Sequence, residues 1–168
     1  WKSYHAGIDY AKASGLPGAT PHELHALDYA VYGYLQRGQD SAARAAVTVA
    51  QGITTTDTRA LVAAYNGTAM AARIPLEQGD WTAAAGVPAP ADSAPTVAAA
   101  LRRFTRAIGS ARSGRPDAAG PEVTALDSLA AVLDAVPEPY WARVVRIKRD
   151  AADAWIRFAS GDTAGGLA

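Results

Sequence analysis

The 168-residue chain contains no cysteine, which excludes disulfide bonds, catalytic thiolates and metal sites built from sulfur ligands. No apolar run approaches the roughly 20 residues that a membrane-spanning helix requires. Sixteen basic residues balance sixteen acidic ones, so no overall field favours nucleic acid or an anionic membrane surface. Composition therefore indicates neither a membrane span nor nucleic-acid binding, and it leaves the cellular compartment open.

Recognisable catalytic motifs are also missing. The sequence has no glycine-rich phosphate loop and no serine in a nucleophile elbow. His22 and His25 lie three residues apart, whereas a helical zinc-protease site needs two histidines four residues apart with a glutamate base. Together with His5 or Asp28 they could still bind a metal ion, but capping and surface roles are the favoured interpretation. We therefore expect a non-enzyme with no cofactor and no metal.

Alanine, in contrast, supplies about a quarter of the residues. It has the highest intrinsic helix propensity and lets helix backbones approach closely, whereas a sheet would favour valine, isoleucine and threonine. The length suits a single domain with a substantial hydrophobic core. Together these features predict an all-α protein of roughly eight helices in antiparallel pairs, with no strand.

The helical pattern is clearest over residues 23–50. Apolar residues recur there at i, i+3, i+4 and i+7 on both sides of Gly38. Gly38 can take the positive φ that ends a helix, and Asp40 can cap the next one. So short a turn makes the two helices fold back as an αα-hairpin, with Ala43 at their close crossing.

Similar signals divide the rest of the chain. Thr20 and Glu23 form a capping box that predicts a helix start. Asp57 and Asp80 are placed to cap later helices, and Pro75 should kink or fray the last turn of a helix over about 58–78. Further helices are expected from Thr96 to a break at Gly114, over about 117–135, and from Pro137 to a turn at Ser160.

The first hairpin resembles a tetratricopeptide repeat in the order of its large and small residues, which are Leu27, Tyr34, Gly38, Ala43, Val47 and Ala50. The runs HALDYAVYGYLQRGQ and PLEQGDW are also similar to a group of uncharacterised bacterial tetratricopeptide-type proteins. Gly38, Gly79, Gly114 and Gly161 are separated by 41, 35 and 47 residues, against about 34 in the family. The resemblance therefore covers half the chain by motif and the rest by architecture.

This resemblance implies one domain over 1–168, with antiparallel helix pairs stacked as a right-handed solenoid. The proline-rich segment 87–95 is a candidate joint. Trp1 matches the aromatic residue that opens a second helix in the family, and the chain stops seven residues after Gly161. We therefore expect a fragment of a longer array.

The resemblance also implies a concave groove lined by the first helix of each pair. Groove-facing residues would lie 13, 10, 6 and 3 positions before each turn glycine: His25, Asp28, Tyr32 and Leu35, then Asn66, Ala69, Arg73 and Leu76. The polar members form the candidate peptide-binding site: His25, Asp28, Tyr32, Asn66 and Arg73. Arg73 is the expected anchor, because a guanidinium can hold a carboxylate through two hydrogen bonds.

The implied function is a non-catalytic scaffold that binds a protein or peptide. The alternative is a helical accessory or regulatory module that binds a small molecule or metal through His25, Asp28, Tyr32 and Arg73. A second candidate surface is a run of arginines that could meet acidic ligands or form a solvated helix face: Arg102, Arg103, Arg106, Arg112 and Arg115.

Overall fold

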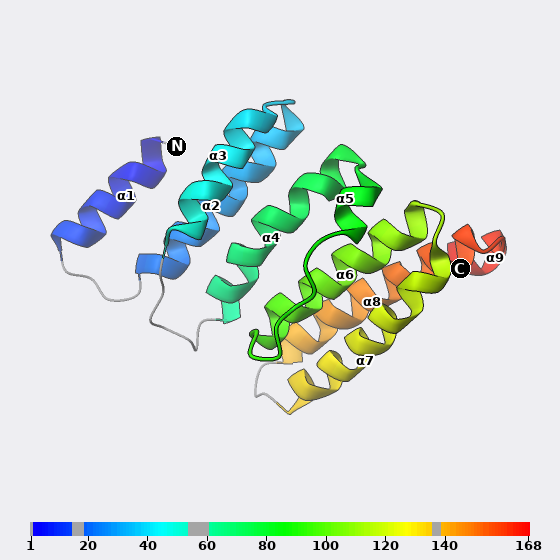
Figure 1. The fold of residues 1–168 in the computed structure, drawn as a ribbon. Helices are drawn as coiled ribbons and strands as arrows, with labels where there is room; N and C mark the ends of the chain where they lie inside the picture. Colours follow the sequence, from blue (N-terminus) through cyan, green and yellow to red (C-terminus); the bar gives the residue numbers. More distant parts are fainter. Residues whose placement is uncertain (1, 15–18, 54–60, 136–138) are drawn as a thin grey trace. The chain divides into compact units, whose positions relative to one another are not determined.

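A computed structural model describes residues 2–14, 19–53, 61–135 and 139–168. Within these ranges every regular element is helical and no strand occurs, which confirms the all-α prediction (Figure 1). The elements are α1 (Lys2–Ala13), α2 (Ala19–Gln36), α3 (Asp40–Gln51), α4 (Leu61–Gln78), α5 (Trp81–Ala85), α6 (Thr96–Arg112), the 3₁₀ helix η1 (Pro116–Ala119), α7 (Gly120–Asp134), α8 (Pro139–Ala159) and α9 (Thr163–Leu167). None of the described helices combines the length and the apolar character needed to cross a membrane.

The chain divides into two compact units, Trp1–Ile74 and Pro75–Ala168. The division falls inside α4, and not at 87–95, where the sequence places a candidate joint. That segment lies within the second unit, between α5 and α6. The helix α4 continues through Pro75 to Gln78, so the predicted fraying does not occur. The Pro75 carbonyl accepts a hydrogen bond from the Asp80 amide at 2.9 Å, which closes the end of the helix.

Four helices end in the same way. In each, a glycine with positive φ is followed by an amide that donates to the carbonyl five residues earlier, at 2.8 to 3.0 Å, which is the Schellman arrangement. A residue with a Cβ is strained at such a φ. The four turn glycines chosen from the sequence are therefore confirmed, with φ values of 66°, 67°, 79° and 93° for Gly38, Gly79, Gly114 and Gly161.

The caps that follow these turns differ. The Asp80 side chain accepts a hydrogen bond from the Ala83 amide at 2.9 Å, as predicted, and so caps α5. Asp40 is not a cap: it is the first residue of α3, and the preceding Gln39 makes no side-chain capping bond. Helix α2 begins at Ala19, so Thr20 lies inside the helix rather than at its cap. The cap expected at Asp57 lies outside the described residues.

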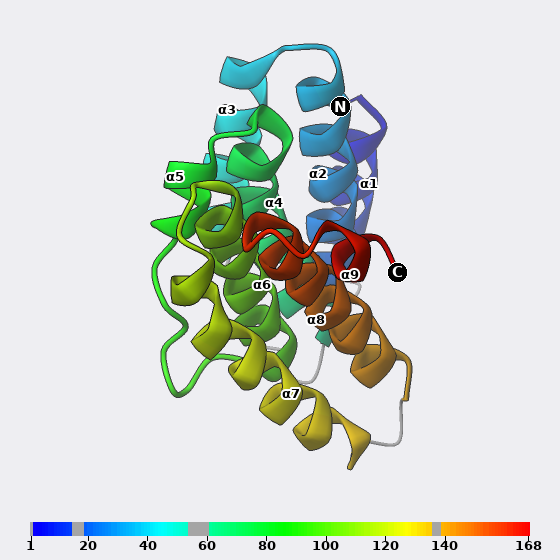
Figure 2. The ribbon, with the colours of Figure 1, turned by 90° about the vertical axis from the view of Figure 1, so that its right-hand side faces the viewer.

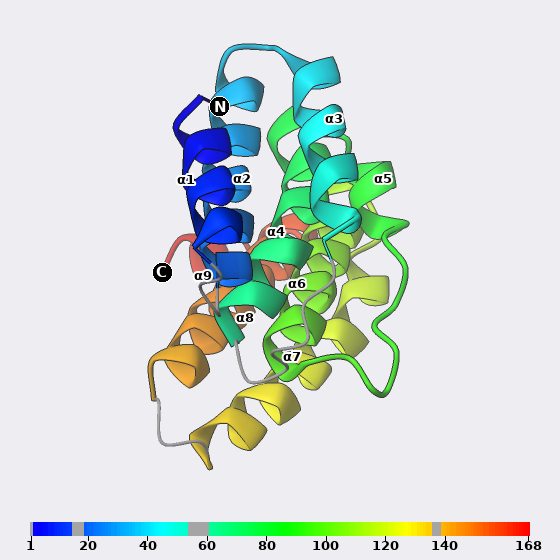
Figure 3. The ribbon, with the colours of Figure 1, turned by 90° about the vertical axis from the view of Figure 1, so that its left-hand side faces the viewer.

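The core of the first unit is made by α2, α3 and α4, with Leu27, Val31, Ala43 and Met70 fully buried. Three residues link α2 to α3, and the two helices pack along each other as an antiparallel hairpin. Figure 3 shows this pair together with α1, which packs against α2. The buried apolar residues of α4 are Ala63, Ala69, Met70, Ala72 and Ile74, and the half-buried Leu61, Tyr65 and Leu76 flank them.

The second unit is built on α6, α7 and α8, which pack against one another (Figure 2). Small residues are fully buried in this core: Ala107 of α6, Ala152 of α8, and Ala119 of η1. The short helix α5 covers part of α6, and α9 packs against α8.

Gly109 marks the closest approach in the second unit. A Cβ atom at this position would lie 2.2 Å from the Ala85 backbone nitrogen and 2.6 Å from the Ala84 carbonyl carbon. Because the obstacle is backbone, a side chain there would have to push α5 away from α6. The pairing of these two helices therefore requires glycine at position 109.

We predict that Gly109→Ala lowers the free energy of unfolding by about 1–3 kcal/mol, because it overpacks this crossing. Gly33→Ala is the matched control, since nothing lies within 4 Å of a Cβ at that exposed site in α2. The control should stabilise the protein by about 0.5–1 kcal/mol through helix propensity. Urea denaturation of both variants tests the contrast, and equal effects would refute the close crossing.

In the first unit, Ala43 is expected to tolerate a larger side chain as poorly as Gly109 does in the second. It is 0% exposed within the core shared by α2, α3 and α4. Ala43→Leu should destabilise the fold by about 1–3 kcal/mol. Ala45→Leu, at an exposed position of the same helix, is the control and should change stability by no more than about 0.5 kcal/mol. An unchanged melting temperature for Ala43→Leu would contradict the packing described here.

Candidate functional site

The five candidate binding residues contact one another across two helices of the first unit. His25, Asp28 and Tyr32 come from α2, and Asn66 and Arg73 come from α4. Three cross-helix contacts join them: Arg73 with Asp28, Arg73 with Tyr32, and Asn66 with His25. The spacing within each helix explains this, because residues three, four or seven positions apart share one helix face.

The Asp28–Arg73 ion pair is the strongest contact of this cluster. Nη2 of Arg73 donates to both carboxylate oxygens of Asp28, at 2.9 and 3.0 Å. The side chains are only 13% and 27% exposed, so water screens the pair less than it would at the surface. Nε of Arg73 is buried and has no hydrogen-bond partner among the described residues.

This ion pair changes the role assigned to Arg73 by the sequence. A guanidinium free to anchor a carboxylate was expected, but the Asp28 carboxylate of the same chain already occupies Nη2. A partner could take that position only by displacing Asp28, which is itself buried. Arg73 therefore holds α2 and α4 together at this point, and it is a poor candidate for a direct anchor.

The rings of Tyr32, His25 and Tyr29 lie around the ion pair. The Arg73 guanidinium carbon lies 5.4 Å from the centre of the Tyr32 ring, a cation–π distance. The Asn66 amide nitrogen lies 3.4 Å from Nδ1 of His25, and Asn66 is buried beneath it. His25 in turn meets the Tyr29 ring edge-on, with centroids 4.9 Å apart. The buried polar groups thus fix an outer layer of rings.

Tyr29 also belongs to this cluster through its contact with His25, although the sequence analysis did not select it. It is 66% exposed and Tyr32 is 44% exposed, so α2 presents two large aromatic side chains to solvent. The signal was available in the sequence, because Tyr29 follows His25 by four residues and so shares its helix face. Positions transferred from the tetratricopeptide groove do not include it.

The described residues contain no cluster of side chains that could bind a metal ion. Within the described ranges, no three or more His, Asp or Glu side chains gather as a metal ion would require. His25 contacts Asn66 and Tyr29 instead. The side chain of His22, the other half of the sequence pair, lies outside the described residues.

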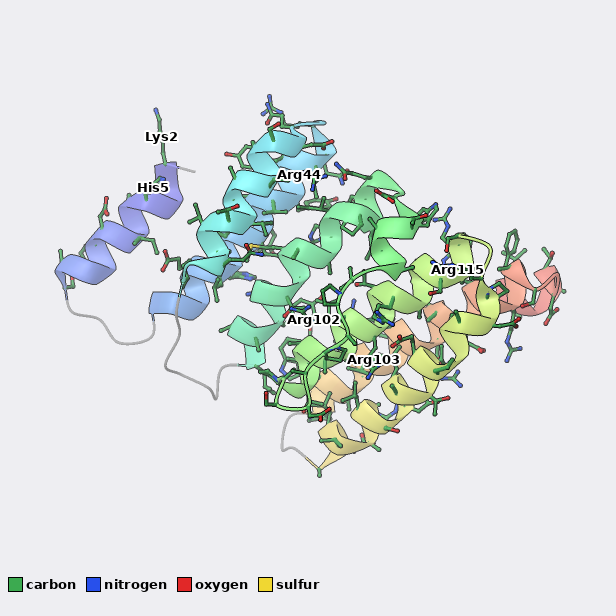
Figure 4. The ribbon with its side chains drawn as sticks, in the orientation of Figure 1. Lys2, His5, Arg44, Arg102, Arg103 and Arg115 are labelled. Atoms are coloured by element: carbon green, nitrogen blue, oxygen red, sulfur yellow. The ribbon has the colours of Figure 1, made fainter. Side chains whose placement is uncertain are left out.

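In the arginine run from Arg102 to Arg115, Arg103, Arg106 and Arg112 contact other elements of the second unit. Arg103 and Arg106 both bind Glu122 of α7, at 2.9 and 2.6 Å, and Glu122 is only 5% exposed. Arg106 also donates to the Val87 carbonyl at 2.8 Å, which fastens the segment after α5. Figure 4 shows Arg102, Arg103 and Arg115 along this part of the chain. Neither of the two predicted alternatives, a ligand surface or a solvated face, describes Arg103 and Arg106.

Arg112 has a different structural role. Its guanidinium carbon lies 3.8 Å from the centre of the Trp81 ring and 4.1 Å from that of Trp155. The cation therefore contacts an aromatic ring from α5 and another from α8. This arrangement joins three helices of the second unit.

Comparison with known proteins adds no assignment to these sites. No protein-family model matches the chain, and no curated protein or solved structure shows significant similarity to it.

We predict that Arg73→Ala destabilises the fold by about 1–3 kcal/mol, because it leaves the buried Asp28 carboxylate without its partner. Arg37→Ala, at an exposed turn position, is the control and should stay within about 0.5 kcal/mol of the parent. In a double-mutant cycle with Asp28→Ala, the double variant should lose about 1 kcal/mol less stability than the sum of the two single losses. Additive losses would show that the pair contributes nothing.

Proposed function

We propose that this chain is a non-catalytic scaffold whose first unit binds a protein or an extended peptide through α2 and α4. The observation that carries the proposal is the pair of exposed tyrosines, Tyr29 and Tyr32, fixed from below by buried polar contacts between the two helices. The binding face is defined as His25, Tyr29 and Tyr32, supported by Asp28, Asn66 and Arg73.

Exposed tyrosine is a favourable residue for recognition. Binding energy in protein interfaces concentrates in tyrosine, tryptophan and arginine, which offer a large contact area with few rotatable bonds. Soluble proteins expose scattered single aromatics without consequence, but here two lie one helical turn apart beside a histidine. Their hydroxyl groups and the His25 ring can also hydrogen-bond a peptide backbone.

Preorganisation supports the same conclusion. Immobilising a rotamer-rich side chain on binding costs about 0.5–1.5 kcal/mol. Tyr32 is already held against the Arg73 guanidinium, and His25 lies between Asn66 and Tyr29. Part of this cost is therefore met during folding. In this arrangement Arg73 positions the contact residues and does not itself bind the ligand.

The resemblance to tetratricopeptide repeats supports this proposal. Positions taken from the groove of that family converge on a single cluster, and four helix ends share one turn geometry. The alternative of a small-molecule or metal module is less well supported, because Asp28 and Nη2 of Arg73, two of the groups it would use, bind each other. A right-handed superhelix remains part of the proposal.

A selection experiment tests the function. We expect that the full chain, immobilised and panned against a random-peptide phage library, enriches peptides that bind in solution. Tyr29→Ala and Tyr32→Ala should each weaken the selected peptides about tenfold or more, the loss typical of a binding hot spot. Fluorescence polarisation with labelled peptides measures the change.

Tyr10→Ala is the matched control, because Tyr10 is 69% exposed on α1 of the same unit but contributes nothing to the proposed face. It should alter affinity less than twofold. Circular dichroism must show the same helix content in all three variants. Failure to enrich any peptide, or equal losses from all three tyrosines, would contradict the proposal.

A further inference from the structure

Helix α8 carries two apolar faces, and one of them is buried within the second unit. Trp141, Val145 and Ala152 are buried against the second unit. A second set recurs with alternating steps of four and three residues, the spacing of a helix-pairing seam. We call this set the α8 seam; it comprises Tyr140, Val144, Ile147, Ala151, Ala154 and Phe158.

Four of the six residues of the α8 seam are exposed, and Val144 and Ala154 are half-buried. Tyr140 is 64% exposed, Ile147 is 61% exposed and Phe158 is 45% exposed. All three belong to the exposed large apolar side chains of the described residues. The Phe158 ring meets the Trp155 ring edge-on, with centroids 5.8 Å apart, and so lies at the border of the packed face of α8.

A hollow of about 330 Å³ lies at the C-terminal end of the seam. Its floor is formed by Ala151 and Ala154, whose small side chains leave the space. Helix α9 closes one side, because Gly166 packs against the Ala154 carbonyl and Phe158. The complete lining is Ala151, Ala154, Trp155, Phe158, Gly166 and Leu167. An aliphatic side chain from outside would fit this site.

Charges of alternating sign flank the seam, in the order Arg143, Asp150 and Arg157. The Asp150 side chain is 71% exposed and pairs with the adjacent Arg149 at 3.3 Å. The Arg157 side chain is 52% exposed and pairs with Asp153 one turn away. Exposed pairs of this kind contribute about 0–1 kcal/mol, so both groups can exchange partners at little cost.

We propose that the α8 seam binds the α8 seam of a second copy of this chain, antiparallel and related by a two-fold axis. The axis passes where Ala151 of one copy faces Ala154 of the other. Ile147 then enters the hollow of the second copy and contacts Phe158 there. In the same register Asp150 lies beside Arg157 of the second copy, twice by symmetry.

This register is favoured over its neighbours by size and charge. Sliding the copies so that Tyr140 faces Phe158 would place the two Asp150 side chains against each other, and Arg143 against Arg157. Sliding further would pair Arg143 with Asp150 but leave the hollow and Phe158 uncovered. Only the proposed register combines small residues at the axis, a filled hollow and opposite charges at the rim.

The self-association is separate from peptide binding. It uses α8 and α9 of the second unit, whereas the proposed binding face belongs to the first unit. Its failure would leave the peptide-binding proposal intact, and the reverse also holds.

Analytical ultracentrifugation of the full chain over a micromolar concentration series tests the proposal. A monomer–dimer equilibrium is expected. Ile147→Lys should weaken it by about tenfold or more, because a charge would be buried in the hollow. Val132→Lys is the matched control, since Val132 is 57% exposed on α7 outside the seam, and it should change the dissociation constant less than about twofold.

Charge-reversal variants test the proposed register. Asp150→Arg and Arg157→Asp should each weaken the dimer about threefold or more, and the double variant should recover most of the loss. Circular dichroism and thermal unfolding confirm that each variant remains folded. A chain that stays monomeric throughout, a dimer indifferent to Ile147→Lys, or a double variant no better than the single ones would overturn the proposal.

Discussion

Close helix approach is the constraint on which this structure depends. Ala43, Ala84 and Gly109 occupy positions where a larger side chain would meet backbone or a filled core. Each contact is short because one partner contributes almost no side chain, which allows dispersion contacts along the whole crossing. The high alanine content is therefore more than a helix preference. It determines which helices can pair and how closely they do so.

Side-chain contacts between α2 and α4 also make the candidate site. Arg73 reaches Asp28 and Asn66 reaches His25, beside a core to which both helices contribute. A buried carboxylate is tolerated because its partner is held at hydrogen-bond distance. Tyr32 lies against the Arg73 guanidinium, and Tyr29 meets the His25 ring. In the proposed function, stability and recognition would therefore depend on the same residues.

Much of the fold could be predicted from the sequence, because its signals are local. Positive φ at Gly38 and Gly79 follows from chain reversal between two amphipathic stretches, which needs no tertiary information. The clustering of His25 with Asn66 followed from a family spacing. The predictions that were wrong depended on tertiary contacts. Asp40 and Asp80 follow the same kind of turn, yet of these two only Asp80 caps a helix.

The role of Arg73 and the second face of α8 show the same limit. Spacing puts Arg73 and Asp28 on facing surfaces, but it cannot tell whether the guanidinium binds Asp28 or an outside carboxylate. On α8, the spacing of Phe158 fits either of the two apolar stripes. Which stripe is buried depends on how α6 and α7 pack against the helix. Gly109 likewise looks like any helix glycine until α5 is placed beside it.

Hydrogen–deuterium exchange of the full chain, with and without a selected peptide, tests the central claim most directly. If His25, Tyr29 and Tyr32 form the contact face, peptide binding should slow amide exchange in 24–36 and in 61–74, while α6 to α8 stay unchanged. Protection confined to the second unit, or none at saturating peptide, would contradict the account.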